Sequence, residues 1–93
     1  MKNISDLTEA IAVMYKCEPS YEGSKLVHEV FEGQTAWQGE VEIFSLKGHP
    51  KAKRCYAWYY TDEEGEKQYT TVLEIPPVDS PETAVKIAVA SQV

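Results

Sequence analysis

The feature that most constrains this chain is a pair of alternating segments joined by a short acidic turn. The first segment, RCYAWYYT (54–61), alternates two sets of side chains: Tyr56, Trp58 and Tyr60 in one set, and Cys55, Ala57 and Tyr59 in the other. The second segment, KQYTTVLEI (67–75), alternates in the same way after DEEGE (62–66). A period of two is typical of a strand, and a short connection containing glycine is typical of a hairpin. We therefore expect two antiparallel strands here.

The clearest boundary of the chain follows these strands. A Pro-Pro pair (76–77) ends the second strand, because proline cannot donate to a strand ladder, and the sequence DSPE (79–82) comes next. Ser80 suits the N-cap of a helix, proline suits its first position, and Glu82 complements the positive end of its dipole. We expect a helix that runs on to Val93, with a packing face of small residues: Ala84, Val85, Ala88 and Val89.

The first half of the chain predicts one helix and two further strands. The helix is indicated by a capping serine and an apolar stripe, formed by Ser5, Leu7, Ile11, Met14 and Tyr15. A polar turn at 19–24 precedes strands expected at about 25–32 and 35–46. In the later strand the alternation breaks at Phe44 and Leu46, which predicts a bulge or a change of partner. Gly39 predicts close packing of another element over the sheet.

These elements together predict an α+β fold with the order α-β-β-β-β-α. We expect residues 1–93 to form a single domain, since no repeat or linker interrupts them. A chain of this size buries roughly 64% of its unfolded surface, which is enough for one modest core. Short turns between strands favour a mostly antiparallel four-stranded sheet. Both helices are expected to pack on one face, leaving the other face partly solvated.

The acidic charge balance limits the partners of the chain. Fifteen Asp and Glu against nine Lys and Arg give a net charge of −6 at pH 7. Such a balance repels phosphate backbones and anionic lipid, so nucleic acid and membrane are unfavoured partners. Asp6 and Glu9 interrupt the segment in which a secretory signal would lie. With two widely spaced cysteines, Cys17 and Cys55, the chain is predicted to be cytoplasmic with reduced thiols.

One segment is locally basic, although the chain as a whole is acidic. The loop KGHPKAKR (47–54) contributes the first candidate binding residues: Lys47, His49, Lys51, Lys53 and Arg54. A cluster of this kind beside aromatic strands is able to clamp a phosphate or a nucleic acid. The alternative interpretation is a solvated loop that offsets a very acidic surface. The sequence leaves both interpretations open and favours the solvated loop.

The aromatic strand supplies the second set of candidate binding residues: Tyr56, Trp58 and Tyr60, with Trp37 and Tyr69 on neighbouring strands. If the helices cover this face of the sheet, the rings belong to the core. If the face is open, the rings form a platform for a protein partner or a second copy. The opposite set, which includes Cys55 and Ala57, matches the small-residue face of the last helix. We therefore expect the aromatic face to be exposed.

The remaining reactive residue types show no catalytic or metal-binding spacing. Structural zinc needs closely spaced ligand pairs, which are missing from the set Cys17, His28, His49 and Cys55. The basic neighbours of Cys55 could lower its pKa, although packing in the core is the stronger explanation of a strand cysteine. His28 lacks an orienting carboxylate, because Glu29 points to the opposite face of the strand. The DEEGE turn does not fit a calcium loop. We expect no metal, no cofactor and no enzymatic activity.

Two resemblances accompany these patterns. The stretches HPKAKRCYAWYY and TTVLEIPPVDSPETAVKIAVAS resemble a group of small uncharacterised bacterial proteins, which implies a stand-alone bacterial domain and no named activity. The order of elements is also similar to the double-stranded RNA-binding fold, α-β-β-β-α. In that family the second helix begins with phosphate-gripping lysines, whereas this chain has SPET there, with Lys86 nearby. The second resemblance is therefore architectural and does not imply RNA binding.

The sequence favours a small non-enzymatic protein-interaction module. Its contact surface is expected to combine the aromatic face with the basic loop 47–54, and its partner to be another protein or a second copy of the chain. The alternative is a binding domain for an anionic small ligand or nucleic acid, centred on the same loop.

Overall fold

The computed structural model describes residues 4–91 and has two helices around four strands. The elements, in chain order, are α1 (Ile4–Tyr15), β1 (Glu18–Phe31), β2 (Gln34–Lys47), β3 (Arg54–Thr61), β4 (Lys67–Leu73) and α2 (Pro81–Ser91). All three strand pairs are antiparallel, and the order in the sheet is β1-β2-β3-β4. The α+β class and the α-β-β-β-β-α order predicted from the sequence are confirmed.

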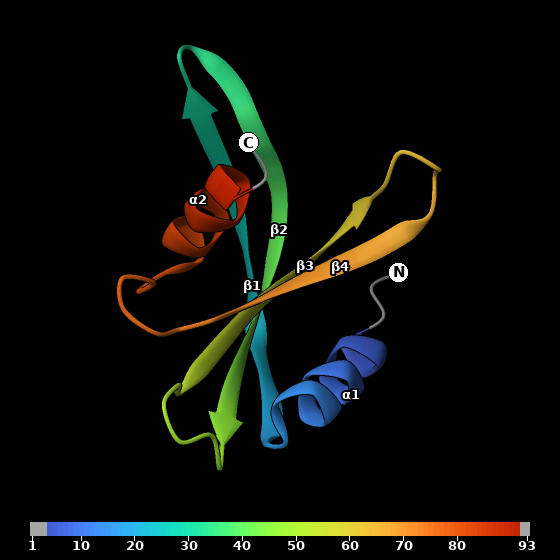
Figure 1. The fold of residues 1–93 in the computed structure, drawn as a ribbon, viewed down its shortest axis with the longest axis vertical. Coiled ribbons are helices and arrows are strands. Elements are labelled where there is room, and N and C mark those ends of the chain that lie inside the picture. The colour runs from blue at the N-terminus through green and yellow to red at the C-terminus, as the bar shows by residue number, and fades with distance from the viewer. Residues whose placement is uncertain (1–3, 92–93) are drawn as a thin grey trace.

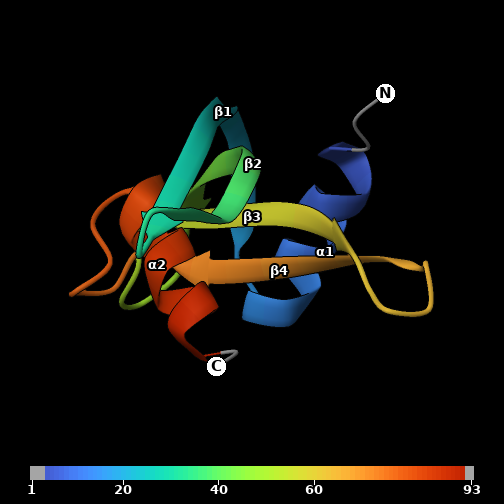
Figure 2. The same cartoon turned by 90° about the horizontal axis from the view of Figure 1, so that it is seen from above.

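The sheet is forked. Strands β1 and β2 pair along almost their whole length, and β3 pairs with β4 over 55–61. The two hairpins are joined only where 42–45 of β2 pairs with 54–57 of β3. Beyond this junction the hairpins diverge, and they run in clearly different directions (Figure 1, Figure 2). Outside this junction β2 and β3 do not pair with each other.

The two helices pack on opposite faces of the sheet, and the expectation that both cover one face is wrong. Helix α1 packs with the Cys55 and Ala57 set of β3. Helix α2 packs with Tyr56 and Trp58, which point to the other side of the same strand. Figure 1 shows the helices at opposite ends of the molecule. Both sets of β3 side chains are apolar, so each face needs its own cover.

Strand β1 is longer than expected. It begins at Glu18, so the polar turn expected at 19–24 is wrong and that segment pairs with the second half of β2. Proline is tolerated there because β1 is an edge strand. A register shift lies between Tyr21 and Gly23, opposite Phe44. The bulge expected at Phe44 is thus on the partner strand, and Phe44 itself is buried beneath α1.

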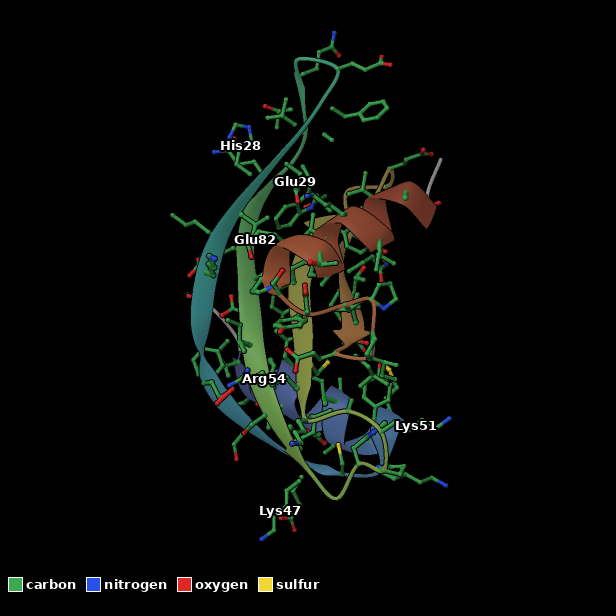
Figure 3. The ribbon with its side chains drawn as sticks, turned by 90° about the vertical axis from the view of Figure 1, so that its left-hand side faces the viewer. His28, Glu29, Lys47, Lys51, Arg54 and Glu82 are labelled. Atoms are coloured by element: carbon green, nitrogen blue, oxygen red, sulfur yellow. The ribbon has the colours of Figure 1, made fainter. Side chains whose placement is uncertain are left out.

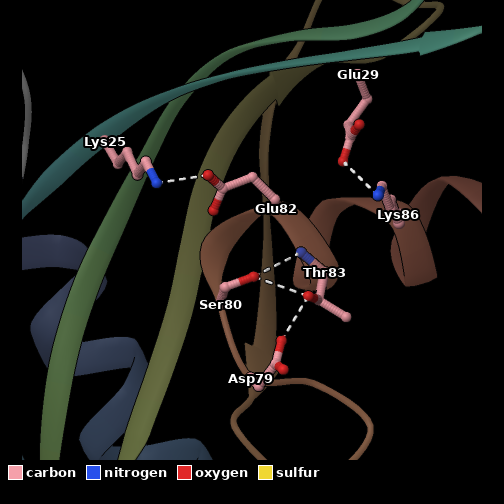
Figure 4. Close-up of polar contacts among 7 residues, drawn as sticks. All are labelled: Lys25, Glu29, Asp79, Ser80, Glu82, Thr83 and Lys86. Atoms are coloured by element: carbon pink, nitrogen blue, oxygen red, sulfur yellow. Dashed lines mark hydrogen bonds and ion pairs between the residues drawn. The ribbon is translucent and has the colours of Figure 1, made fainter.

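Helix α2 begins as the sequence predicts. Oγ of Ser80 accepts a hydrogen bond from the backbone N–H of Thr83 at 3.2 Å (Figure 4). The helix begins with proline and has an acidic first turn. Lys25 of β1 forms an ion pair with Glu82 at 2.5 Å, which ties the start of the helix to the sheet. The predicted extension of the helix to Val93 lies outside the described residues.

Neither α1 nor α2, over residues 4–91, is long and apolar enough to cross a bilayer.

Candidate functional site

The candidate aromatic residues of β3 differ in how deeply they are buried. Tyr56 and Trp58 are buried beneath α2, so the expectation of an exposed aromatic face is wrong for them. The small side chains of Ala84 and Val85 allow α2 to approach the large rings closely, which is why this helix covers the aromatic set. Tyr60, farther along the strand, is 41% exposed. The aromatic set is therefore core at one end and surface at the other.

A cleft lies where the aromatic end of β3 meets the fork. Its volume is about 370 Å³, within the range of roughly 300–1,000 Å³ typical of ligand pockets. Aromatic side chains from two strands form its walls: Trp37, Trp58 and Tyr60. Ala88 and Val89 of α2 and the 61–63 segment complete the lining. We call this hollow the aromatic cleft.

The two tryptophans of the cleft pack against each other. The ring centroids of Trp37 and Trp58 are 5.6 Å apart, in an edge-to-face arrangement typical of stable aromatic pairs. The indole of Trp37 also lies over Gly39, where an added Cβ would meet it at 2.9 Å. The close packing predicted at Gly39 is thus supplied by a ring of the same strand. Glycine at this position allows Trp37 to lie across the strand beside the cleft.

The rim of the cleft is acidic and ordered. Asp62 accepts hydrogen bonds from the backbone N–H groups of Glu64 and Glu66, at 3.0 and 2.9 Å. It also accepts one from the side-chain amide of Gln68 at 3.1 Å. These bonds, led by the backbone bond from Glu66, hold the pKa of Asp62 below its ordinary value. A fixed carboxylate therefore lies beside Glu63 at the mouth of the cleft.

The basic loop does not bring its charges together. Arg54 is held by Glu22 at 3.0 Å, and this bond is the main reason why its pKa is raised. Nδ1 of His49 accepts the backbone N–H groups of Lys51 and Ala52, at 3.1 and 2.9 Å. The side chains of Lys47 and Lys51 point away from each other into solvent (Figure 3). Lys53, the last candidate of the loop, is exposed.

Arg54 and Tyr56 are the two candidates that share a second, polar hollow. It has a volume of about 380 Å³ and lies beside the start of α2. The hydroxyl of Tyr56 donates to Glu74, and the pKa of Tyr56 is raised, first by burial and then by this bond. Arg54 lies near both Glu22 and Glu74. The charges of this hollow bind one another, which fits a structural role.

The reactive side chains considered in the sequence have ordinary structural surroundings. Cys55 is fully buried, and burial raises its pKa to about 12, so its thiol stays protonated at neutral pH. His28 is exposed, and its Nε2 lies 2.8 Å from the hydroxyl of Thr35. Over residues 4–91, no group of three or more His, Cys, Asp or Glu side chains is arranged to hold a metal ion.

Sequence patterns identified the walls of the cleft but missed its rim and its position. Strand alternation indicates Trp37, Trp58 and Tyr60 as candidates, whereas Asp62 and Glu63 belong to a turn that is considered in the sequence only as a calcium loop. The fork brings the two groups together, and it depends on how far β2 pairs with β3. The signal available in the sequence was the acidic turn directly after an aromatic strand.

Comparison with known proteins adds no relative: no family model, curated protein or solved structure matches the chain.

Proposed function

We propose that the chain is a non-enzymatic protein-interaction module that binds a basic segment of a partner protein in the aromatic cleft. The observation that carries the proposal is the meeting of three aromatic rings and an ordered carboxylate around one hollow of about 370 Å³. Aromatic ring faces attract cations, and the attraction grows as the cation loses water.

The charge of the cleft supports a cationic partner over an anionic one. Asp62 and Glu63 form its rim, and the 62–66 turn contains four acidic residues in five. The chain as a whole carries a net charge of −6, which attracts a basic segment at long range. An arginine or lysine side chain fits such a site well, because its apolar stem packs on rings while its charged head reaches carboxylates.

The surroundings of the reactive residues support a binding role. Cys55 is enclosed in the α1 core with a raised pKa, and the hydrogen bonds of His49 order its own loop. Both cysteines are free, which accords with the reducing cytoplasm of a bacterium as the location of the module.

Tryptophan fluorescence provides a direct test, because the only two tryptophans of the chain, Trp37 and Trp58, both line the cleft. A short blocked peptide of consecutive arginines is titrated at low salt, beside a peptide with glutamine in their place. The arginine peptide is expected to give a saturable change that weakens as salt is added. Equal responses to the two peptides, or none to either, would refute the proposal.

Two tyrosines of matched exposure locate the site. Tyr60 lines the cleft and is 41% exposed, while Tyr69 on β4 is 42% exposed and points to the α1 face. Tyr60→Ala is expected to weaken binding by roughly 3- to 30-fold, as the loss of ~0.5–2 kcal/mol of cation–π attraction implies. Tyr69→Ala should leave the affinity unchanged. If both variants weaken binding equally, the peptide binds elsewhere.

A further inference from the structure

A third hollow lies between α2 and the tip of the β1–β2 hairpin. Its volume is about 560 Å³, and its apolar lining comes from both elements: Val30, Phe31, Ala36, Val89 and Ala90. Lys86 of α2 and Glu29 of β1 add charge to the lining. Exposed apolar side chains that gather around one hollow can form a contact site. We call it the tip groove.

An aromatic side chain stands beside the tip groove. Phe31 is 70% exposed, and it comes directly before the two-residue turn Glu32–Gly33. Both turn residues have positive φ, 53° and 78°, which is the geometry that closes a tight, rigid hairpin. The tip projects past α2 (Figure 1), so Phe31 is carried on an ordered projection that a second molecule can reach.

The charges around the tip groove are complementary. Nζ of Lys86 forms a long ion pair with Oε1 of Glu29 at 3.9 Å, beyond hydrogen-bond distance (Figure 4), and the Lys86 side chain is 67% exposed. Oε1 of Glu29 is buried and has no hydrogen-bond partner among the described residues. Glu32 lies exposed at the turn, next to Phe31. Lys86 thus borders the tip groove, and the exposed Glu32 directly follows Phe31 in the chain.

We propose that two copies of the chain associate through this surface, each placing Phe31 in the tip groove of the other. A two-fold contact requires a patch that is complementary to itself. Here an aromatic projection and an apolar hollow lie on one patch, and Glu32 of one copy would meet Lys86 of the other. A groove for an unrelated protein needs no projection of its own, which is why a second copy is the occupant that the surface favours.

Sedimentation equilibrium of the full chain over a wide concentration range tests the association. The wild type is expected to dimerise reversibly, and Phe31→Ser to raise the dissociation constant at least tenfold. Leu26→Ser is the matched control, since Leu26 is 80% exposed on the same strand and does not line the groove. A wild type that stays monomeric, or a Phe31→Ser variant that dimerises like Leu26→Ser, would overturn the proposal.

A charge exchange distinguishes a specific contact from general hydrophobic association. Glu32→Lys and Lys86→Glu are each expected to weaken the dimer, because each places like charges opposite each other. The double variant should recover most of the lost affinity, since it restores the opposite charges in reversed order. Additive losses in the double variant would contradict the pairing of Glu32 with Lys86 across the interface, and with it the proposed arrangement.

Discussion

In the basic loop the charged side chains point apart or pair with neighbours, whereas in the aromatic cleft three rings and an ordered carboxylate border one hollow. His49 accepts two backbone N–H groups of its own loop, and Arg54 is held by Glu22. In the cleft, the rings of Trp37 and Tyr60 and the carboxylate of Glu63 line a space of about 370 Å³. Both regions stand out in the sequence. The difference is that only the cleft is formed by strands that separate.

This difference shows how a small sheet can form a hollow without a long loop. Strand β3 pairs with β2 through four residues, 54–57, and continues beyond them with β4 alone. On the continuing part Trp58 is buried by α2, whereas Tyr60 is 41% exposed at the cleft. A charged loop, in contrast, offers many solvated conformations, and its charges are easily neutralised by neighbouring acidic side chains.

The largest expected effect is a difference in stability: a substitution in the aromatic cleft should destabilise the fold far more than one in the basic loop. Trp58 is only 4% exposed and lies between the cleft and the core under α2, so Trp58→Ala should lower the free energy of unfolding by about 3–5 kcal/mol. Lys51 is exposed in the basic loop, and Lys51→Ala should change the free energy of unfolding by less than about 0.5 kcal/mol. Urea unfolding measures both. Similar losses in the two variants would contradict the division into core-backed cleft and solvated loop.

A smaller effect tests the internal order of the basic loop. His49→Ala removes the acceptor of two backbone N–H groups and should cost about 1 kcal/mol, in the range of a lost helix cap. His49→Asn keeps a short side-chain acceptor and should recover part of that loss. Urea unfolding of the two variants provides the comparison. If His49→Ala were neutral, the bonds to Lys51 and Ala52 would contribute little and the loop would be solvated throughout.

Several features of the fold could be predicted because they depend on neighbouring residues in the chain. The alternation in 54–61 correctly places Tyr56 and Cys55 on opposite faces, and the DSPE sequence correctly places the start of α2. These signals act over a few residues. The period of a strand, the side-chain bond of Ser80 and the conformational limits of proline are all local.

Other features could not be predicted because they depend on contacts between distant segments. Alternation shows that two sets of side chains lie on opposite faces, but it does not show which helix covers which set. The extension of β1 back to Glu18 depends on pairing with β2, which outweighs the turn tendency of the local sequence. The junction at 42–45 likewise depends on how two hairpins twist. The position of the cleft follows from that junction.

The smallest expected effect concerns the ordered carboxylate at the rim. Asp62 has a folded-state pKa below its ordinary value of 3.8, chiefly because the backbone N–H of Glu66 binds its charged form. A depressed pKa means that the stabilising contribution of Asp62 is complete above the ordinary value and is lost as the pH falls through the folded-state value. Below about pH 4, therefore, the turn should loosen and the cleft should lose affinity for the arginine peptide.

Asp62→Asn isolates this contribution from the other carboxylates. The amide of asparagine can still accept a backbone N–H but carries no charge, so the variant should bind the arginine peptide more weakly at neutral pH, by at most about 5-fold because the charge pair is exposed. The gap between wild type and variant should close as the pH falls below 4, because Asp62 then becomes neutral as well. A gap that stays constant with pH would show that Asp62 acts through the shape of the turn alone. The cleft would then attract cations through its rings and Glu63, and the acidic turn would serve, like the basic loop, mainly to order itself.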